Sequence, residues 1–396
     1  MRNVYMDNNA TTPIHPEVQE AIKQALPIYG NASSHHAFGE EARERVEDAR
    51  AKLAQLINAD PSEIIFTSCG SESNNLVLKG VTCEYVACKP KDAPGGRHLI
   101  TSQIEHPSVK NTSNCLEQRG FKVTWLPVDE YGLVDPEDLK KAITRQTVLV
   151  SIMLGNNEIG TLEPVQELCA IAREHGVYFH TDAVQALGKV KVDVKELGVD
   201  FLSLSGHKLY APKGIGALYL KKGRMICPLF HGGHQEGGLR VGTENTLGII
   251  ALGKAAELAQ SDMGREVPQI QALRDRLKKG IAERVPDVKF NGHPDKVLPG
   301  TLNVSFLYVE GESILLRLSG QGIAVSTGSA CSSGTLDPSH VLLALGLSHE
   351  VAHGSIRFSL GRENTAADVD YVLDVLPGVI ADLRKMSPLS RAKAAK

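Results

Sequence analysis

The chain has no apolar run long enough to cross a bilayer, no dense cluster of basic residues and no cysteine pair at CxxC spacing. A membrane-spanning helix needs about 20 apolar residues, so we expect no association with a membrane. The formal net charge of -3 gives no electrostatic reason to expect a nucleic-acid partner. The seven scattered cysteines argue against a disulfide framework and against a zinc ribbon, and we expect no metal site.

The first residues, 1–9, contain no apolar stretch of the kind found in a signal peptide. Together with the unpaired cysteines, this predicts a protein of the reducing cytoplasm and leaves room for one cysteine with a chemical role. A composition that is 42% hydrophobic and 22% charged is typical of a globular protein. Because 396 residues exceed one ordinary core, we expect two domains.

Helical and strand patterns alternate from about residue 15 to about residue 260. Strands separated by helices favour βαβ units and therefore a mostly parallel sheet flanked by helices. Seven short apolar stretches are the predicted strands of this sheet: 64–67, 98–101, 123–125, 148–153, 177–182, 201–204 and 216–220.

The pattern changes after residue 259. A charged helix is predicted at 269–284, and strands are predicted at 301–306 and 356–359. This mixture indicates a smaller α+β domain. We therefore assign 15–259 to a large α/β domain and the remainder, 1–14 and 260–396, to the smaller one.

One lysine stands where a strand is predicted to end. The stretch 201–204 runs into Ser205-Gly-His-Lys208, and a loop rich in proline and glycine follows. Ligands of open α/β sheets bind at the carboxyl ends of the strands. Lys208, with a hydroxyl and an imidazole close by in sequence, is therefore a candidate for a Schiff base with an aldehyde cofactor. The alternative is an ordinary solvated lysine.

Other residues near predicted strand ends suit an aromatic cofactor with a phosphate. Asp182 ends a predicted strand, and a carboxylate there can pair with a protonated ring nitrogen. Gln185 follows three residues later, about one turn of a helix further along the chain. Gly70 and Ser71 form a turn into a helix, whose N–H groups suit a phosphate, and Ser205 can add a hydroxyl. For Asp182 and for the Gly70 turn, the alternative is an ordinary helix cap.

Three more residues are candidates for contacts with a ring or with a carboxylate. His106 follows the strand predicted at 98–101 and can stack on a flat ring, although a lone histidine is more often structural or solvated. Asn157 can bond a ring hydroxyl or a substrate carboxylate, and its alternative is turn chemistry. Arg357 lies in a predicted strand and suits bidentate capture of a carboxylate, or it is a surface residue.

Cys331 lies in a loop of small residues, Ser326-Thr-Gly-Ser-Ala-Cys331-Ser-Ser-Gly334. Free cysteines are most often buried, but this loop has few apolar residues to pack against. An exposed, mobile thiol suits a nucleophile that must travel.

The stretch 248–254 matches most of a nucleotide-binding loop. Position 255 is an alanine, however, so the hydroxyl that would hold Mg²⁺ is missing. The stretch is therefore predicted to be an apolar helix.

Taken together, the motifs resemble the NifS/IscS-type cysteine desulfurases, which are pyridoxal-phosphate enzymes of fold type I. The resemblance covers nearly the whole chain and leans toward the NifS-like member at 207–214 and 232–236. One departure is Cys69-Gly70-Ser71, where the family usually shows Gly-Ala-Thr. Ten motifs occur in the family's order: Tyr5–Pro13, Gly30–His35, Phe66–Asn74, Thr101–His106, Asn156–Gly160, His180–Gln185, Ser205–Lys208, Arg240–Thr243, Gly328–Ser333 and Ile356–Leu360.

The resemblance implies a role for each candidate residue. Lys208 matches the Schiff-base lysine, and Asp182 and Gln185 match the partners of the pyridine nitrogen and the ring oxygen. His106 matches a histidine that stacks on the ring and relays protons, and Cys331 matches the sulfur acceptor. The remaining matches are the phosphate cup (Gly70, Ser71, Ser205 and His207), a phosphate ligand supplied by the neighbouring subunit of a homodimer (Thr243), and the grip on the substrate carboxylate (Asn157 and Arg357).

The implied activity is the removal of sulfur from L-cysteine, which gives L-alanine and a persulfide on Cys331. The resemblance further implies an iron–sulfur scaffold or another protein as the sulfur acceptor, and L-selenocysteine stays an alternative substrate. An aminotransferase or another lyase of the same fold would share Lys208 and Asp182 but would have no use for Cys331. A non-catalytic sulfur carrier would use Cys331 and leave Lys208 and Asp182 without a purpose.

Overall fold

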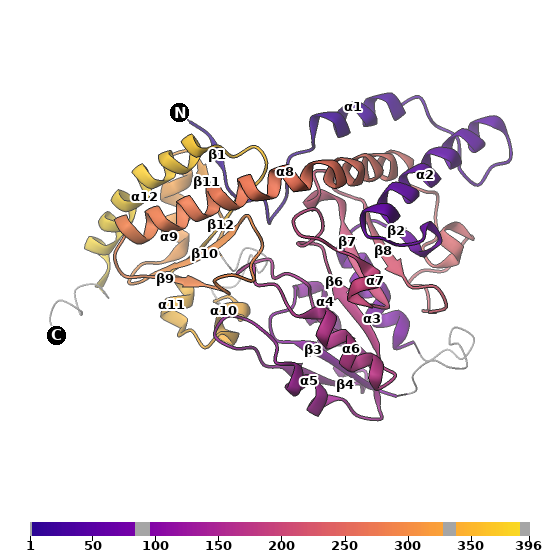
Figure 1. The fold of residues 1–396 in the computed structure, drawn as a ribbon, viewed down its shortest axis with the longest axis horizontal. Helices are drawn as coiled ribbons and strands as arrows, with labels where there is room; N and C mark the ends of the chain where they lie inside the picture. The colour runs from indigo at the N-terminus through magenta and orange to yellow at the C-terminus, as the bar shows by residue number, and fades with distance from the viewer. Residues whose placement is uncertain (1, 84–95, 328–337, 389–396) are drawn as a thin grey trace.

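The computed structural model describes residues 2–83, 96–327 and 338–388. Its main sheet has seven strands: β2 (Ile64–Thr67), β3 (His98–Ser102), β4 (Lys122–Leu126), β5 (Thr147–Ser151), β6 (Tyr178–Asp182), β7 (Phe201–Ser205) and β8 (Gly216–Leu220). Their order across the sheet is β2-β8-β7-β6-β5-β3-β4 (Figure 1). Strand β8 is antiparallel to both of its neighbours, and all other neighbouring pairs are parallel. The mostly parallel sheet and all seven of its predicted strands are confirmed.

Alternate residues of these strands enter two separate apolar cores, one on each face of the sheet. In β3, for example, Leu99 enters one core and Ile100 the other, as the two-residue period of a strand requires. Both faces are therefore covered, which is the usual condition of a mostly parallel sheet. The core that contains Leu99 packs against α3 (Gly70–Val81) and α4 (Pro107–Gln118).

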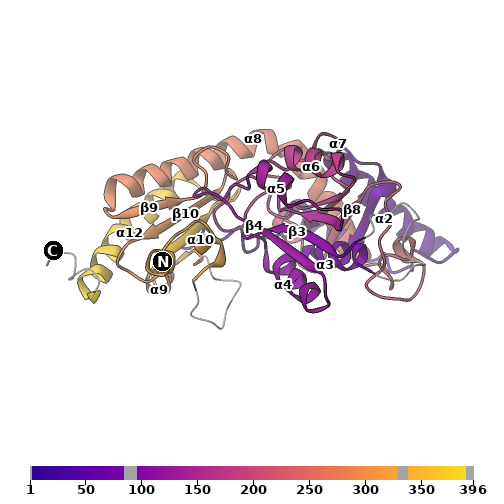
Figure 2. The ribbon, with the colours of Figure 1, turned by 90° about the horizontal axis from the view of Figure 1, so that it is seen from below.

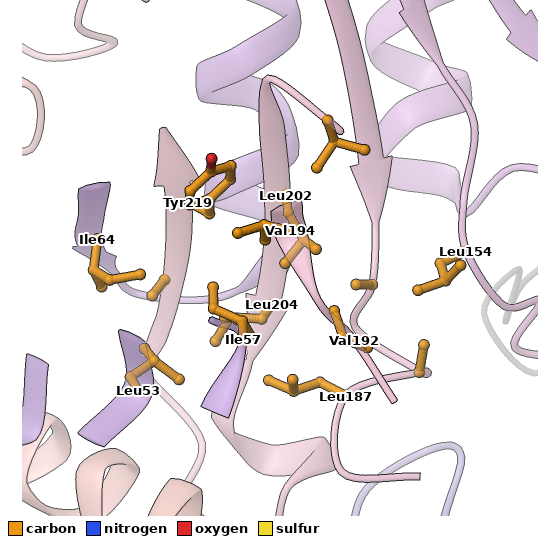
Figure 3. Packing of buried hydrophobic residues seen from close by; sticks show 14 of the residues in the cluster. Leu53, Ile57, Ile64, Leu154, Leu187, Val192, Val194, Leu202, Leu204 and Tyr219 are labelled. Atoms are coloured by element: carbon orange, nitrogen blue, oxygen red, sulfur yellow. The ribbon is translucent and has the colours of Figure 1, made fainter. Parts of the chain in front are cut away.

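The larger core lies on the other face of the sheet. Figure 3 shows part of it, where Leu53 and Ile57, at the end of one covering helix, gather with Leu204 of β7. Because these side chains are almost completely buried, the face is sealed from water. The helices that contribute are α1 (Pro16–Ala25), α2 (Ala37–Leu56), α5 (Pro136–Ala142), α6 (Val165–Glu174), α7 (Val194–Leu197) and the first part of α8 (Thr246–Arg284).

A smaller body of structure has its own apolar core, in which Phe306, Phe358 and Leu376 are buried. It contains an antiparallel sheet with the order β12-β10-β9 and a parallel pair of β1 and β11. The strands predicted at 301–306 and 356–359 are confirmed. The elements of this body are β1 (Val4–Tyr5), β9 (Val288–Asn291), β10 (Thr301–Phe306), β11 (Ile323–Ala324), β12 (Ser355–Ser359), α9 (Gly311–Ser319) and α12 (Ala366–Met386). The short helices α10 (His340–Ala344) and α11 (His349–His353) form a separate small apolar cluster with Ile104 and Ile159 of the large body.

Helix α8 has 39 residues and runs along both bodies (Figures 1 and 2). Its first part, including 248–254, packs into the larger core, and Leu277 and Ile281 pack into the smaller one. The helices predicted at 248–254 and 269–284 are both helical in the structure, but they belong to one helix, and the proposed boundary after residue 259 falls inside it. The sequence pattern changes there because the helix passes from one buried environment to another. Neither α8 nor any other helix of the described chain has the length and apolar character needed to cross a membrane.

The N-terminal segment also joins the two bodies. Val4 and Met6 lie in the smaller core, and β1 pairs with β11. Asp7 then forms a bridge with Ser359 of β12, and the N–H of Thr12 donates to the carbonyl of His207, just beyond β7. Residues 7–12 therefore cross from the smaller body to the carboxyl edge of the large sheet.

Candidate active site

The candidate residues gather at the carboxyl edge of the large sheet. Asp182 and Ser205 are the last residues of β6 and β7, which are parallel neighbours. The short helix η3 (Gly206–Lys208) follows β7 and carries Lys208. His106 is the N-cap of α4, which follows β3 in the chain. The structure thus brings Lys208, Asp182 and His106 to the edge at which open α/β sheets bind ligands.

Gly70 begins helix α3 in a tightly packed position. A β-carbon at Gly70 would lie 2.6 Å from Cγ2 of Val184 and 3.5 Å from Cβ of Ser205, so a larger residue would push the helix away from this edge. The Ser205 hydroxyl is buried and has no hydrogen-bond partner among the described residues. Ser71 follows in the first turn of α3 and is exposed. A buried, unpaired hydroxyl beside a helix N-terminus fits the phosphate of a cofactor.

Cys69, the departure from the family pattern, is the N-cap residue of α3. Its backbone is extended and its side chain does not cap the helix. The Sγ atom instead lies 3.7 Å from the hydroxyl oxygen of Ser68. The thiol therefore leaves the first N–H groups of α3 available to a ligand.

A chain of hydrogen bonds connects His106 to Asp182. Nδ1 of His106 lies 2.7 Å from the Ser108 hydroxyl, which accepts from Nδ2 of Asn74 at 2.8 Å. The same Nδ2 donates its other hydrogen to Oδ2 of Asp182 at 2.7 Å. The N–H of Val184 donates to Oδ1 of Asp182 at 2.9 Å, so both carboxylate oxygens are fixed. The predicted partner of a ring nitrogen is thus held in one orientation.

The same contacts define the protonation of His106. The N–H of Ser108 donates to Nδ1 of His106 at 3.1 Å, so this nitrogen is an acceptor. A neutral ring must then carry its proton on Nε2. Burial lowers the pKa of His106, Asp182 opposes that shift and Lys208 adds to it. These contacts favour the neutral imidazole, with Nε2 as a proton donor.

Lys208 contacts the N-terminal segment. Its amine donates to the backbone carbonyls of Asn9 and Ala10, the latter at 2.6 Å. The carbonyl of Asn9 also accepts from Nε2 of Gln185 at 2.9 Å. The predicted Schiff-base lysine and the predicted ring-oxygen partner therefore share one backbone acceptor from the beginning of the chain.

Arg357 and Asn157, the two predicted partners of a substrate carboxylate, are in contact with each other. Nη1 of Arg357 donates to the backbone carbonyl of Asn157 at 2.9 Å, and Nη2 pairs with Oδ1 of Asp7 at 2.8 Å. The Nε atom is buried and has no partner among the described residues. Because both Nη atoms are engaged, the edge of the guanidinium that includes Nε is the one best placed to take a carboxylate.

Of the other predicted site residues, one contacts the residues at the sheet edge, one does not, and one is not described by the structure. Nδ1 of His207 lies 3.1 Å from the Thr11 hydroxyl, and burial together with nearby lysines lowers the pKa of His207 to about 4. Thr243 is exposed on the loop ahead of α8, and no hydrogen bond of the described residues joins it to the sheet edge. Cys331 lies outside the described residues.

Two buried glutamates support the turns that carry His106 and Asn157. Glu105 accepts from the Ser102 hydroxyl at 2.7 Å and from the N–H of Met153 at 3.0 Å, and burial raises its pKa to about 8. Glu158 accepts from the Ser339 hydroxyl at 2.5 Å, and burial raises its pKa to about 7. Burial therefore favours the protonated form of both carboxyl groups well above the pH at which an exposed glutamate ionises.

Sequence reasoning missed several residues that hold this site together. Asn9 and Asn74 lie inside motifs noted for other members, and Ser108 lies two residues beyond one of them. Only their contacts reveal what these three residues do. Lys189 had no signal beyond its position one turn after Gln185.

Comparison with known proteins agrees with this architecture. Residues 4–372 match the family model for class-V aminotransferases. Cysteine desulfurase IscS of Dictyoglomus turgidum is 54% identical over 388 residues, which cover 98% of this chain and 97% of that protein. Cysteine desulfurase 2 of Trichormus variabilis is 49% identical, covering 100% of this chain and 97% of that protein. A solved structure titled NifS-like protein has a TM-score of 0.89 and 39% identity, covering 96% of this chain and 100% of that one.

A large, mostly parallel sheet with its polar edge closed by a smaller α+β body defines an enzyme of the class-V aminotransferase fold. The chain belongs to this family and, within it, to the cysteine desulfurases of the IscS and NifS type.

Proposed function

We propose that this cysteine desulfurase binds pyridoxal phosphate at the carboxyl edge of its large sheet and transfers the sulfur of L-cysteine to Cys331. The observation that carries the proposal is the meeting of Lys208, the fixed Asp182 carboxylate and the unpaired Ser205 hydroxyl at that edge. This set fits the cofactor, because it offers an amine to the aldehyde, a carboxylate to the ring nitrogen and a hydroxyl to the phosphate.

Different residues of the chain would bind different parts of the cofactor and of the substrate. The first turn of α3, with Gly70 and Ser71, and the Ser205 hydroxyl would hold the phosphate, while His207 completes the cup. Asp182 would keep a negative charge opposite the ring nitrogen, and Asn157 and Gln185 would hold the ring oxygen. The buried guanidinium of Arg357, beside Asn157, would orient the substrate through its carboxylate.

Bound pyridoxal phosphate would supply an electron sink that acidifies the Cα–H bond of the substrate. The Lys208 amine would take the Cα proton and later return a proton. The Cys331 thiolate would attack the substrate sulfur, so that an S–S bond forms on Cys331 as the C–S bond breaks, and the remaining carbon skeleton leaves as alanine. His106, neutral and protonated on Nε2, can supply a proton during this exchange.

The partners follow from the same proposal. The persulfide on Cys331 would pass to an iron–sulfur scaffold or another acceptor protein. A homodimer would let Thr243 bind the phosphate of the neighbouring subunit, as the family resemblance implies.

Leu26, Tyr29 and Phe38 are 62%, 76% and 53% exposed, and the rings of Tyr29 and Phe38 are 5.3 Å apart. An apolar surface of this kind suits a second copy of the chain, and the molar mass in solution, measured by light scattering, tests the dimer.

The decisive experiment measures the alanine released and the sulfur bound to the protein. Wild-type protein with pyridoxal phosphate and L-cysteine should release alanine and should gain one sulfur on the peptide that carries Cys331, as read by mass spectrometry. Cys331→Ala should still bind the cofactor but should lose turnover by about a thousandfold or more, as expected when a nucleophile is deleted. Cys115→Ala, which changes a half-buried thiol of α4, is the matched control and should keep full activity. Full alanine production by Cys331→Ala would refute the assignment.

Borohydride reduction tests the lysine separately. The reduced cofactor should be found on the peptide that carries Lys208 and should be absent from Lys208→Ala. Attachment to another lysine would show that the active-site lysine has been assigned wrongly.

A further inference from the structure

One lysine at the active-site edge has no part in the function proposed above. Lys189 lies one turn beyond Gln185, in the segment that follows β6. It is half-buried and lines a cavity that Asn8, Lys208 and Leu258 also line. It forms hydrogen bonds with two side-chain amides rather than with a carboxylate, which is unusual for a lysine.

The amine of Lys189 connects two residues of the site. Its Nζ donates to Oε1 of Gln185 at 2.9 Å and to Oδ1 of Asn9 at 3.1 Å. Gln185 in turn donates from Nε2 to the carbonyl of Asn9, which also accepts from the Lys208 amine. Lys189 and Lys208 therefore approach Asn9 from its side chain and its backbone respectively.

These contacts decide how both amides are oriented. A lysine amine donates hydrogen bonds, so it selects the oxygen of each amide and not the nitrogen. With Oε1 turned to Lys189, the Nε2 of Gln185 must face Asn9 and the active-site edge. With Oδ1 turned to Lys189, the Nδ2 of Asn9 faces the carbonyl of Asn157 at 3.2 Å and the hydroxyl of Thr301 at 2.9 Å.

The arrangement depends on the presence of the Lys189 amine but not on its charge. Burial lowers the pKa of Lys189 to about 7, and the neighbouring charges of Lys208 and Arg357 act in the same direction. Either protonation state still has enough hydrogens to serve both oxygens. Without the amine, two buried amide oxygens would lose a donor, and such unpaired groups are costly.

We propose that Lys189 is a positioning residue that fixes the amides of Gln185 and Asn9, so that Gln185 presents Nε2 to the ring oxygen of the cofactor. This inference rests on the proposed function, because it assumes that Gln185 contacts the cofactor. Lys189 itself does not touch the reacting atoms and acts through Gln185.

A double-mutant cycle on cofactor binding tests the proposal. Lys189→Met keeps most of the length of the side chain and removes its donors, and Gln185→Ala removes the amide through which it acts. The dissociation constant for pyridoxal phosphate is measured by equilibrium dialysis, with the near-visible spectrum of each loaded protein. Each single variant should weaken binding by about tenfold, the scale of one hydrogen bond. The double variant should bind no more weakly than Gln185→Ala alone.

Controls separate a positioning role from a structural one. Lys191→Met changes an exposed lysine two residues further on and should bind the cofactor like wild type. The melting temperature of each apoprotein reports stability independently of the cofactor. If Lys189→Met fails to fold, Lys189→Gln, which keeps an N–H donor, enters the same cycle and should bind the cofactor more tightly than Gln185→Ala.

Two results would overturn the inference while leaving the proposed function intact. One is wild-type affinity and an unchanged spectrum in Lys189→Met. The other is a double variant whose loss equals the product of the two single losses, because Lys189 would then act independently of Gln185. Wild-type protein that fails to bind pyridoxal phosphate would instead refute the proposed function itself.

Discussion

Asn74→Asp is a nearly isosteric change that tests the hydrogen-bond chain between His106 and Asp182. In the wild type, Nδ2 of Asn74 donates to Oδ2 of Asp182 at 2.7 Å, and Asn74 is only 1% exposed. The substitution puts a second carboxylate next to the first. Two carboxylates this close cannot both ionise freely, so the pair should retain one proton that each would lose in water.

The size of the effect follows from the separation. Charge centres about 4 Å apart repel by about 4 kcal/mol at an effective dielectric constant of about 20, which is about three pKa units. The pair should therefore hold its proton up to about pH 7, against about pH 4 in the unfolded chain. Because the folded-state pKa is raised, the stability that depends on this proton is present below about pH 4 and is lost as the pH rises to about 7.

Urea unfolding of the apoprotein at pH 5 and pH 8 measures this loss. Asn74→Ala is the control, because it removes the same hydrogen bonds without adding a charge. It also retains the carboxyl groups of Glu105 and Glu158, whose raised pKa values make them titrate in the same pH range, so their contribution cancels in the comparison. Relative to that control, Asn74→Asp should lose about 2–3 kcal/mol more at pH 8 than at pH 5. A difference that does not change with pH would show that Asp182 is not a charged neighbour of position 74.

Three further predictions concern other parts of the structure. Asp182→Asn should bind the cofactor yet lose roughly two orders of magnitude in alanine production, the scale of losing a main electrostatic element, and near-wild-type turnover would contradict that role. Glu105→Gln should resist urea better than wild type at pH 9 and show less advantage at pH 5. The reason is the raised pKa of Glu105, about 8, because of which the wild-type protein loses stability as the pH rises from about 4 to about 8. An equal effect at both pH values would argue against the ionisation of Glu105. Arg50 forms a two-point ion pair with the buried Glu236 at 2.8 and 2.9 Å, so Arg50→Met should lower the free energy of unfolding by about 3–5 kcal/mol, and a loss below about 1 kcal/mol would mean that the pair does not stabilise the fold.

The sheet could be predicted from the sequence because its signals are local. Each strand is a short apolar stretch followed by polar or glycine-rich residues. Asp182 is the last residue of β6, and Lys208 follows β7 by three residues. Helix α8 could not be predicted as one element, since its apolar face changes where it leaves the larger core for the smaller one. Periodicity identifies a face but cannot show that two faces belong to one helix.

The contacts of the site were beyond prediction for a different reason. Asn9 and Lys208 are separated by almost 200 residues, and no periodic pattern connects them. Asn74 and Ser108 are ordinary polar residues in sequence, and their importance comes from lying between His106 and Asp182. Chemical type gave the candidate residues for cofactor contacts, whereas the residues that orient these candidates became visible only through distances.

The pairing of the first strand with a late one has a consequence for how the enzyme is made. Val4 pairs with Ile323, so it can pair only after more than 300 further residues have been made. At about 5–20 residues per second, this delay is roughly 15–60 s. A nascent chain can already contain the complete large sheet, Lys208 and Asp182 while its first strand still lacks a partner. Arg357 of β12 comes later in the chain than Ile323, so the candidate site cannot be complete before that strand has been made.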